Sequence, residues 1–200
     1  SKLEKRRNVS EFIIGFSLLF LGLSLMKNSV PDLQQTPEVL SFIKTWSGFG
    51  FGSVLIFLVF GTILTLVLQS SSATMAITLI MLSMGWIPFN MACAMVLGEN
   101  IGTTITANIA ASVGNTQAKR AAMSHTIFNV FGVMWALLLF KPFLALVGCI
   151  TEYIFGLPNP ASEGFEVSES ISAEGTAALY GLSMLHTLFN TINTFILIWC

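Results

Sequence analysis

A run of one glutamine and three serines, Gln69 to Ser72, interrupts a long apolar stretch of this 200-residue chain. A helix that ends before the run leaves carbonyl oxygens without partners, and one that restarts after it leaves free N–H groups. The serines can cap the second helix, whose positive dipole end favours an anion, while hydroxyl and carbonyl oxygens favour a hard cation such as Na⁺. The three serines, Ser70, Ser71 and Ser72, therefore predict a site for an anion and a sodium ion together.

A second polar segment, Gly98 to Thr104, interrupts the apolar stretch 91–113. Its two glycines and two threonines predict another break in a helix at membrane depth. Asn100, Thr103 and Thr104 supply the same oxygen ligands as the serines. The alternative is that the threonines only bond to their own helix.

Glu99 is the one ionisable carboxylate between Lys44 and Lys119. An acidic residue within a membrane segment is a candidate functional group by default. It could equally be a protonated packing residue or lie near a wet cavity, so both interpretations stay open.

One short repeat is visible. His125-Thr-Ile-Phe-Asn129 and His186-Thr-Leu-Phe-Asn190 share a pattern 61 residues apart. In each copy the histidine and the asparagine four residues later face the same side of a helix, which favours hydrogen bonds between helices. We therefore expect a structural role for the histidines, with Asn129 and Asn190 as possible site residues. Proton coupling or metal binding by the histidines is the alternative.

The composition places this chemistry in a bilayer. The chain is 54 % hydrophobic and 10 % charged, with a mean hydropathy of +0.80, whereas soluble domains carry about 25 % charged residues. A net charge of −1 gives no indication of nucleic acid as a partner. The three cysteines are odd in number and far apart, so they indicate neither a disulfide framework nor a zinc site.

The apolar pattern predicts an all-α polytopic membrane protein with a single transmembrane domain over residues 1–200. Its expected parts are a span at 12–30, a re-entrant hairpin at 49–86, a broken span at 91–113, a span at 121–140, an acidic extracellular loop at 151–174 and a span at 176–200. The first residue is not methionine and the last lies in an apolar run, so we expect a piece of a longer protein.

The hairpin is expected because its returning arm is short. Residues 72–86 make a helix of about 21 Å, and the hydrocarbon core is about 30 Å thick. Trp46 and Trp86 bracket the hairpin, as expected if both feet rest at one interface. The alternative is an ordinary helix pair whose polar turn lies at the far surface.

Basic residues favour the cytoplasmic side. Lys2 to Arg7 and the basic loop 114–120 are therefore expected inside, and the acidic loop outside. This predicts a multi-pass protein of a plasma membrane or a bacterial inner membrane with its N-terminal end in the cytoplasm.

No arginine or lysine accompanies either polar break, so cations would have to offset the charge of a bound oxyanion. Opposite unit charges ~4 Å apart attract by about 4 kcal/mol at an effective dielectric constant of ~20. Such a term couples the two affinities reciprocally. The pattern thus indicates cotransport, with Na⁺ as the coupling ion and no further cofactor.

The motifs Gln69-Ser-Ser-Ser-Ala-Thr74 and Gly98-x-Asn-Ile-Gly-Thr-Thr104 resemble the type II sodium/phosphate cotransporter family. The resemblance implies Na⁺-driven transport of inorganic phosphate, with Gln69 to Ser72 in the sodium and substrate site and Thr74 as a further residue of that site. The family carries the serine motif twice, in inverted repeats, and this chain is similar to the second. A missing first half or a second copy of the chain would then complete the site. Glu99 stands where the resemblance implies alanine.

Two functions from other classes remain as alternatives. An intramembrane serine hydrolase would use Ser71 with His125 or His186, given a base within reach and an oxyanion hole. A scaffold or regulator built on the same half would not transport at all. The hydroxyl run beside a glutamine favours ion binding, so we expect a transporter and not an enzyme.

Overall fold

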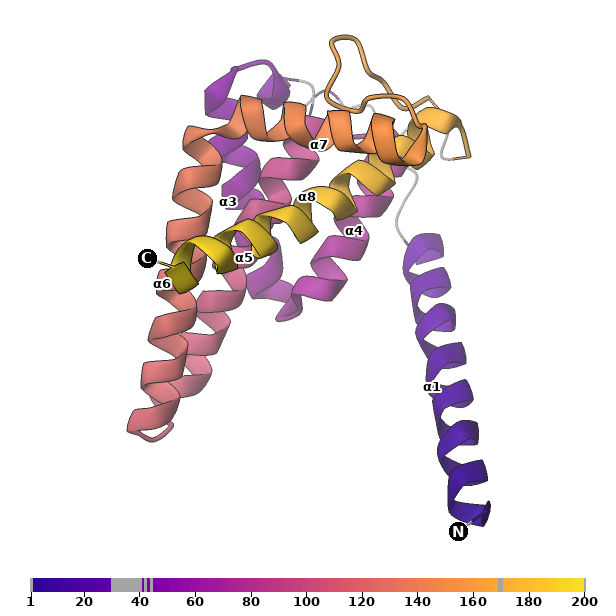
Figure 1. Ribbon diagram of the computed structural model, residues 1–200, viewed down its shortest axis with the longest axis vertical. Coiled ribbons are helices and arrows are strands. Elements are labelled where there is room, and N and C mark those ends of the chain that lie inside the picture. The colour runs from indigo at the N-terminus through magenta and orange to yellow at the C-terminus, as the bar shows by residue number, and fades with distance from the viewer. Residues whose placement is uncertain (1, 30–40, 42, 44, 169–170, 200) are drawn as a thin grey trace. The chain divides into compact units, whose positions relative to one another are not determined.

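The computed structural model describes residues 2–29, 41, 43, 45–168 and 171–199, and these contain helices and turns but no strand. The named helices are α1 (Lys2–Ser29), α3 (Phe51–Leu68), α4 (Ser71–Ser83), α5 (Phe89–Ser112), α6 (Thr116–Leu138), α7 (Phe140–Phe155) and α8 (Ala173–Trp199) (Figure 1). This confirms the expected all-helical class. The chain divides into two compact units, Ser1–Thr36 with α1 and Pro37–Cys200 with the other helices.

Three of the described helices, α3, α6 and α8, are long and apolar enough to cross a membrane. Only 28 % of the most apolar window of each is buried inside the protein, so most of their surface is free to face lipid. The expected span at 12–30 falls within α1 up to residue 29, and Val30 lies outside the described residues.

The centre of the second unit is α5, which contacts α3, α4, α6 and α8. The six residues from Ala92 to Leu97 are fully buried. α5 was expected to be a broken span, but it is not among the three helices that hydropathy marks as candidate spans. Because its surroundings are other helices, it can carry polar side chains that a lipid-facing helix could not.

The break expected at Gly98 to Thr104 is wrong, because α5 runs unbroken through this segment. A Cβ on Gly98 would overlap the Leu58 carbonyl oxygen of α3, and one on Gly102 would lie 2.6 Å from the Thr65 Cβ. The Thr62 hydroxyl also donates to the Gly98 carbonyl oxygen at 2.9 Å. The glycines thus allow the α3 and α5 backbones to touch, as small residues do between membrane helices.

The loops are shorter than expected. Of the basic loop 114–120, residues from Thr116 onward belong to α6, whose N-cap Asn115 accepts a hydrogen bond from the Ala118 N–H at 2.9 Å. In the expected acidic loop 151–174, the first five residues belong to α7 and the last two belong to α8. Its residues 169–170 lie outside those described.

The α7 helix was not predicted. It lies across the end of α6 (Figure 1) and buries one face, including Phe143 and Val147. Pro142 stands in its first turn, where proline is tolerated because the N–H groups there have no helical partner. The sequence pattern ended the preceding span at residue 140 and left this amphipathic helix unassigned.

Trp86 does not mark an exposed foot of the hairpin, because it is only 5 % exposed. The neighbouring Gly85 has a φ of 69°, and a Cβ there would overlap the Val167 carbonyl oxygen. The connection between α7 and α8 therefore covers this end of α4.

Candidate functional site

The expected break at the polar run is present. α3 ends at Leu68, and Gln69 takes the left-handed conformation with a φ of 52° while its N–H donates to the Thr65 carbonyl oxygen at 2.8 Å. Ser70 is the extended N-cap of α4, and its hydroxyl oxygen accepts from the Ala73 N–H at 3.2 Å. One serine is thus committed to capping, and the next two begin the helix that follows.

A cavity of about 360 Å³ opens beside this first turn of α4. Its lining comes from four helices, α4, α5, α6 and α8, which belong to the same compact unit. The polar residues that line it are Ser71, Ser72, Glu99, Asn100, Thr103, His125, Asn129, His186 and Asn190. Neither lysine nor arginine is among the described lining residues.

The cavity brings together seven of the eleven residues expected from the sequence: Ser71, Ser72, Glu99, Asn100, Thr103, Asn129 and Asn190. The other four do not line it. Gln69 is exposed at the α3–α4 turn, and Ser70 caps α4. Thr74 is fully buried against α3, 3.2 Å from the Thr65 hydroxyl, and Thr104 donates to the Ile101 carbonyl oxygen at 2.7 Å.

Asn100 and Thr103 bring oxygen acceptors to the polar lining. The side-chain NH₂ of Asn100 donates to the Val96 carbonyl oxygen at 2.8 Å, and the Thr103 hydroxyl donates to the Glu99 carbonyl oxygen at 2.8 Å. The Thr103 hydroxyl oxygen and the Asn100 amide oxygen keep lone pairs that can face the cavity, because neither oxygen accepts in these bonds. Hard cations such as Na⁺ bind such oxygens.

Glu99 is the acidic residue of this lining and is 4 % exposed. Its Oε1 lies 2.8 Å from the Thr78 hydroxyl of α4. No salt bridge reaches it among the described residues. A buried carboxylate without a cationic partner is costly unless a bound cation or a proton neutralises it.

The histidines were expected to have a structural role through hydrogen bonds between helices. The amides of Asn129 and Asn190 instead donate to the carbonyl oxygens of His125 and His186 in the same helix, at 3.0 and 2.9 Å. Both histidines line the cavity. The four-residue spacing correctly put each pair on one helix face, but nothing in it identified the cavity that this face lines.

Buried polar contacts hold the two repeat-bearing helices together. The Asn193 amide of α8 donates to the Phe128 carbonyl oxygen of α6 at 2.8 Å and accepts from the Trp135 indole at 3.2 Å. Gly132 makes room for Asn193, since a Cβ there would lie 2.6 Å from its nitrogen. Both copies of the repeat therefore reach the same cavity.

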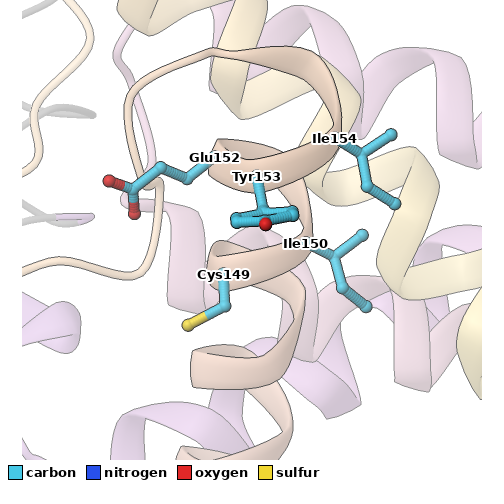
Figure 2. A pocket seen from close by; sticks show the side chains of 5 residues that line it. All are labelled: Cys149, Ile150, Glu152, Tyr153 and Ile154. Carbon is cyan, nitrogen blue, oxygen red and sulfur yellow. The ribbon is translucent and has the colours of Figure 1, made fainter.

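A second hollow, of about 690 Å³, lies along α7. Figure 2 shows its labelled side chains, Cys149, Ile150, Glu152, Tyr153 and Ile154, all on this one helix. Tyr153 is 94 % exposed. Because the five come from one helix and include one carboxylate, the hollow lacks the converging polar groups of a binding site.

A family sequence model described as Na+/Pi-cotransporter matches residues 44–157, which include the polar run, all of α5 and the first copy of the repeat. The chain belongs to this family. Its members are transporters and not enzymes, which excludes the hydrolase alternative. With three candidate spans, the chain is a multi-pass membrane protein.

Two curated relatives are similar to parts of the chain. The chain is 34 % identical over 155 residues to "Uncharacterized protein YqeW" of Bacillus subtilis, a match that covers 75 % of this chain and 46 % of the relative. It is 27 % identical over 134 residues to "Putative inorganic phosphate export protein YjbB" of Escherichia coli, covering 67 % of this chain and 23 % of the relative. The chain thus spans less than half the length of these two relatives. No solved structure matches it.

Proposed function

We propose that the full-length protein carries inorganic phosphate together with Na⁺ across a plasma membrane or a bacterial inner membrane, by alternating access around the cavity beside Ser71. The observation that carries the proposal is this single cavity. It joins the first turn of α4, the polar segment of α5 and both copies of the histidine repeat. Family membership and the relative named for phosphate export support phosphate as the substrate.

The lining explains why cations would be needed. Serine hydroxyls, the N-terminal N–H groups of α4 and the imidazoles can donate to phosphate oxygens. No lysine or arginine of the described lining offsets the charge of phosphate, and an ionised Glu99 would add to that charge. Sodium ions held by Ser71, Ser72, Asn100 and Thr103 would supply the positive charge.

Helix register supports a re-entrant hairpin. Ser71 and Thr103 line the same cavity, so the hairpin tip lies about level with Thr103 of α5. From that level α5 continues for nine more residues, about 13 Å, to Ser112, so the hairpin tip stops short of the end of α5. α4 has only 13 residues, about 20 Å, so it is too short to cross a hydrocarbon core of about 30 Å.

The chain matches less than half the length of its relatives, which supports the proposal that it is one half of an inverted-repeat transporter. A first-repeat half, or a second copy of this chain, would complete the site from the other side. Gln69 and Ser70, as proposed ligands at the tip, would then meet sodium or phosphate from that side. The basic stretch before residue 8 supports a cytoplasmic N-terminal end.

Transport by the full-length protein in proteoliposomes tests the proposal. Uptake of ³²P-phosphate should require an inward Na⁺ gradient, and K⁺ should not replace Na⁺. Uptake that ignores sodium would contradict the symport, and a protein that moves no phosphate would favour the scaffold alternative.

A further inference from the structure

A third hollow, of about 940 Å³, lies where α3 and α5 begin and where α6 passes into α7. Its volume is within the range of about 300–1,000 Å³ that is usual for ligand sites. Residues 160–165 of the α7–α8 connection also line it, and the charged residues of its described lining are Lys141 and Glu163. This Lys141 hollow shares no described lining residue with the cavity beside Ser71.

The length of α6 places the Lys141 hollow at the level of lipid headgroups. From Lys119 to Leu138 the helix rises about 29 Å, which matches a hydrocarbon core of about 30 Å. Lys119 and Arg120 are exposed and costly to place in hydrocarbon, so they lie at one interface and Leu138 lies at the other. α7 lies across this end of α6 and buries one face only, as is typical of a helix in the interface (Figure 1).

Apolar side chains of the Lys141 hollow are left open to the surroundings. Phe51 at the start of α3 is 55 % exposed, and Leu138 at the end of α6 is 82 % exposed. Both helices are candidate spans whose surface is mostly unburied within the protein. At this depth the chains of a lipid are the groups that can cover such side chains.

Two oppositely charged side chains complete the lining. Lys141 is the only lysine or arginine after Arg120 in the sequence, and it is exposed in the first turn of α7. Glu163 is exposed in the α7–α8 connection. Neither makes a salt bridge within the described parts of the chain. An ammonium group binds phosphate oxygens and a carboxylate binds an ammonium group, so the two side chains complement a headgroup that carries both charges.

We propose that the Lys141 hollow binds one phospholipid with an amine-bearing, zwitterionic headgroup of the phosphatidylethanolamine type. Lys141 holds the phosphate, Glu163 holds the ammonium group, and an acyl chain packs against Phe51 and Leu138. Free phosphate would leave the apolar lining uncovered, and an anionic headgroup would be repelled by Glu163. The proposal does not depend on phosphate transport, which is proposed for the cavity beside Ser71.

Native mass spectrometry of the full-length protein in detergent measures lipid binding directly. The protein is titrated with phosphatidylethanolamine and with phosphatidylglycerol that carries the same acyl chains. Lys141→Gln should weaken binding of phosphatidylethanolamine about fivefold, because it removes the charge that meets the phosphate. Lys119→Gln is the matched control, because this lysine lies in the first turn of α6 and does not line the hollow.

The carboxylate is tested by the choice between the two lipids. Glu163→Gln should lower the preference for phosphatidylethanolamine over phosphatidylglycerol about fivefold, because one charge near the lipid surface changes affinity by about this factor. Glu166→Gln is the control, because Glu166 is exposed in the same connection and lies outside the hollow.

A third variant tests the hollow without changing its charges. Ala145 is exposed on α7 and lines the hollow, so a tryptophan there can fill the space without entering the core. Ala145→Trp should lose binding of both lipids. Leu146→Trp should keep it, because Leu146 is exposed on the same helix but does not line the hollow.

Four results would overturn the proposal. The first is equal lipid binding by the wild type, Lys141→Gln and Ala145→Trp. The second is a preference of the wild type for phosphatidylglycerol. The third is displacement of the lipid by excess inorganic phosphate, which would assign Lys141 to the free anion. The fourth is a wild type that binds no lipid and forms a dimer, which would show that a second copy of the chain covers the hollow.

Discussion

The two polar segments of this protein look alike in sequence and differ in structure. At Gln69 the backbone turns into a left-handed conformation, and a new helix starts from the Ser70 cap. At Gly98 the α5 helix continues without a break. The difference lies in what covers the backbone. The first segment contains the serine that caps α4, and the second packs against α3 through its glycines.

The two segments contribute different groups to one cavity. The break supplies free N–H groups and serine hydroxyls, while the continuous helix holds Glu99, Asn100 and Thr103 along one line. A ligand in the cavity therefore contacts a helix end on one side and a packed helix on the other. Changes to the two segments should have different effects.

The largest expected effect is on stability, from Gly98→Ala. The added Cβ would overlap the Leu58 carbonyl oxygen, which belongs to a helix backbone and cannot rotate away. Overpacking of this kind costs about 1–3 kcal/mol or more, so we expect a clearly lower melting temperature in detergent. Gly52→Ala in α3 is the control, because its Cβ would lie 3.6 Å from the Phe49 Cβ, an ordinary contact. Equal melting temperatures for the two variants would show that α3 and α5 do not touch at Gly98.

Ser71→Ala should affect binding more than folding. The hydroxyl lines the cavity and is not the cap of α4. Loss of a hydrogen bond to a charged ligand costs about 1.5–3 kcal/mol, so sodium and phosphate affinities should both fall about tenfold or more. Isothermal titration of the full-length protein measures both, with Ser168→Ala in the acidic loop as control. Unchanged affinities in Ser71→Ala would remove this serine from the site.

Ser70→Ala should affect the helix start instead. Removing an N-cap side chain costs about 1 kcal/mol, which would appear as a modest loss of stability and as faster amide exchange at Ala73. Hydrogen exchange with mass spectrometry detects this change. If exchange near Ala73 stays as in the wild type, the capping bond has no role in holding the break.

The smallest effect is expected from Thr104→Val. Thr104 is 1 % exposed, bonds only within α5 among the contacts described, and lies outside the cavity. A valine has nearly the same shape and loses only a bond to a carbonyl oxygen of its own helix, so stability should change by about 0.5–1 kcal/mol and both affinities should stay the same. A tenfold loss of phosphate affinity would restore Thr104 as a ligand and weaken the contrast between the two segments.

The sequence predicted the break at Gln69 to Ser72 because capping is a local property, readable from a polar run between apolar segments. It mispredicted Gly98 to Thr104 because a glycine can either break a helix or make room for a neighbouring backbone. The sequence does not distinguish these two roles, and only the position of α3 does. The cavity position of the histidines was not predicted for a similar reason. Spacing gave the face that His125 and His186 share with their asparagines, but the cavity depends on how α6 and α8 cross at Asn193.

The central claim is that one cavity binds sodium and phosphate together without help from lysine or arginine. The most direct test is the phosphate affinity of the full-length protein, measured by equilibrium binding of ³²P-phosphate over a series of Na⁺ concentrations at constant ionic strength. The affinity should rise with Na⁺, and by reciprocity phosphate should raise the affinity for Na⁺ by the same factor. A phosphate affinity that is the same in Na⁺ and in K⁺ would contradict the account.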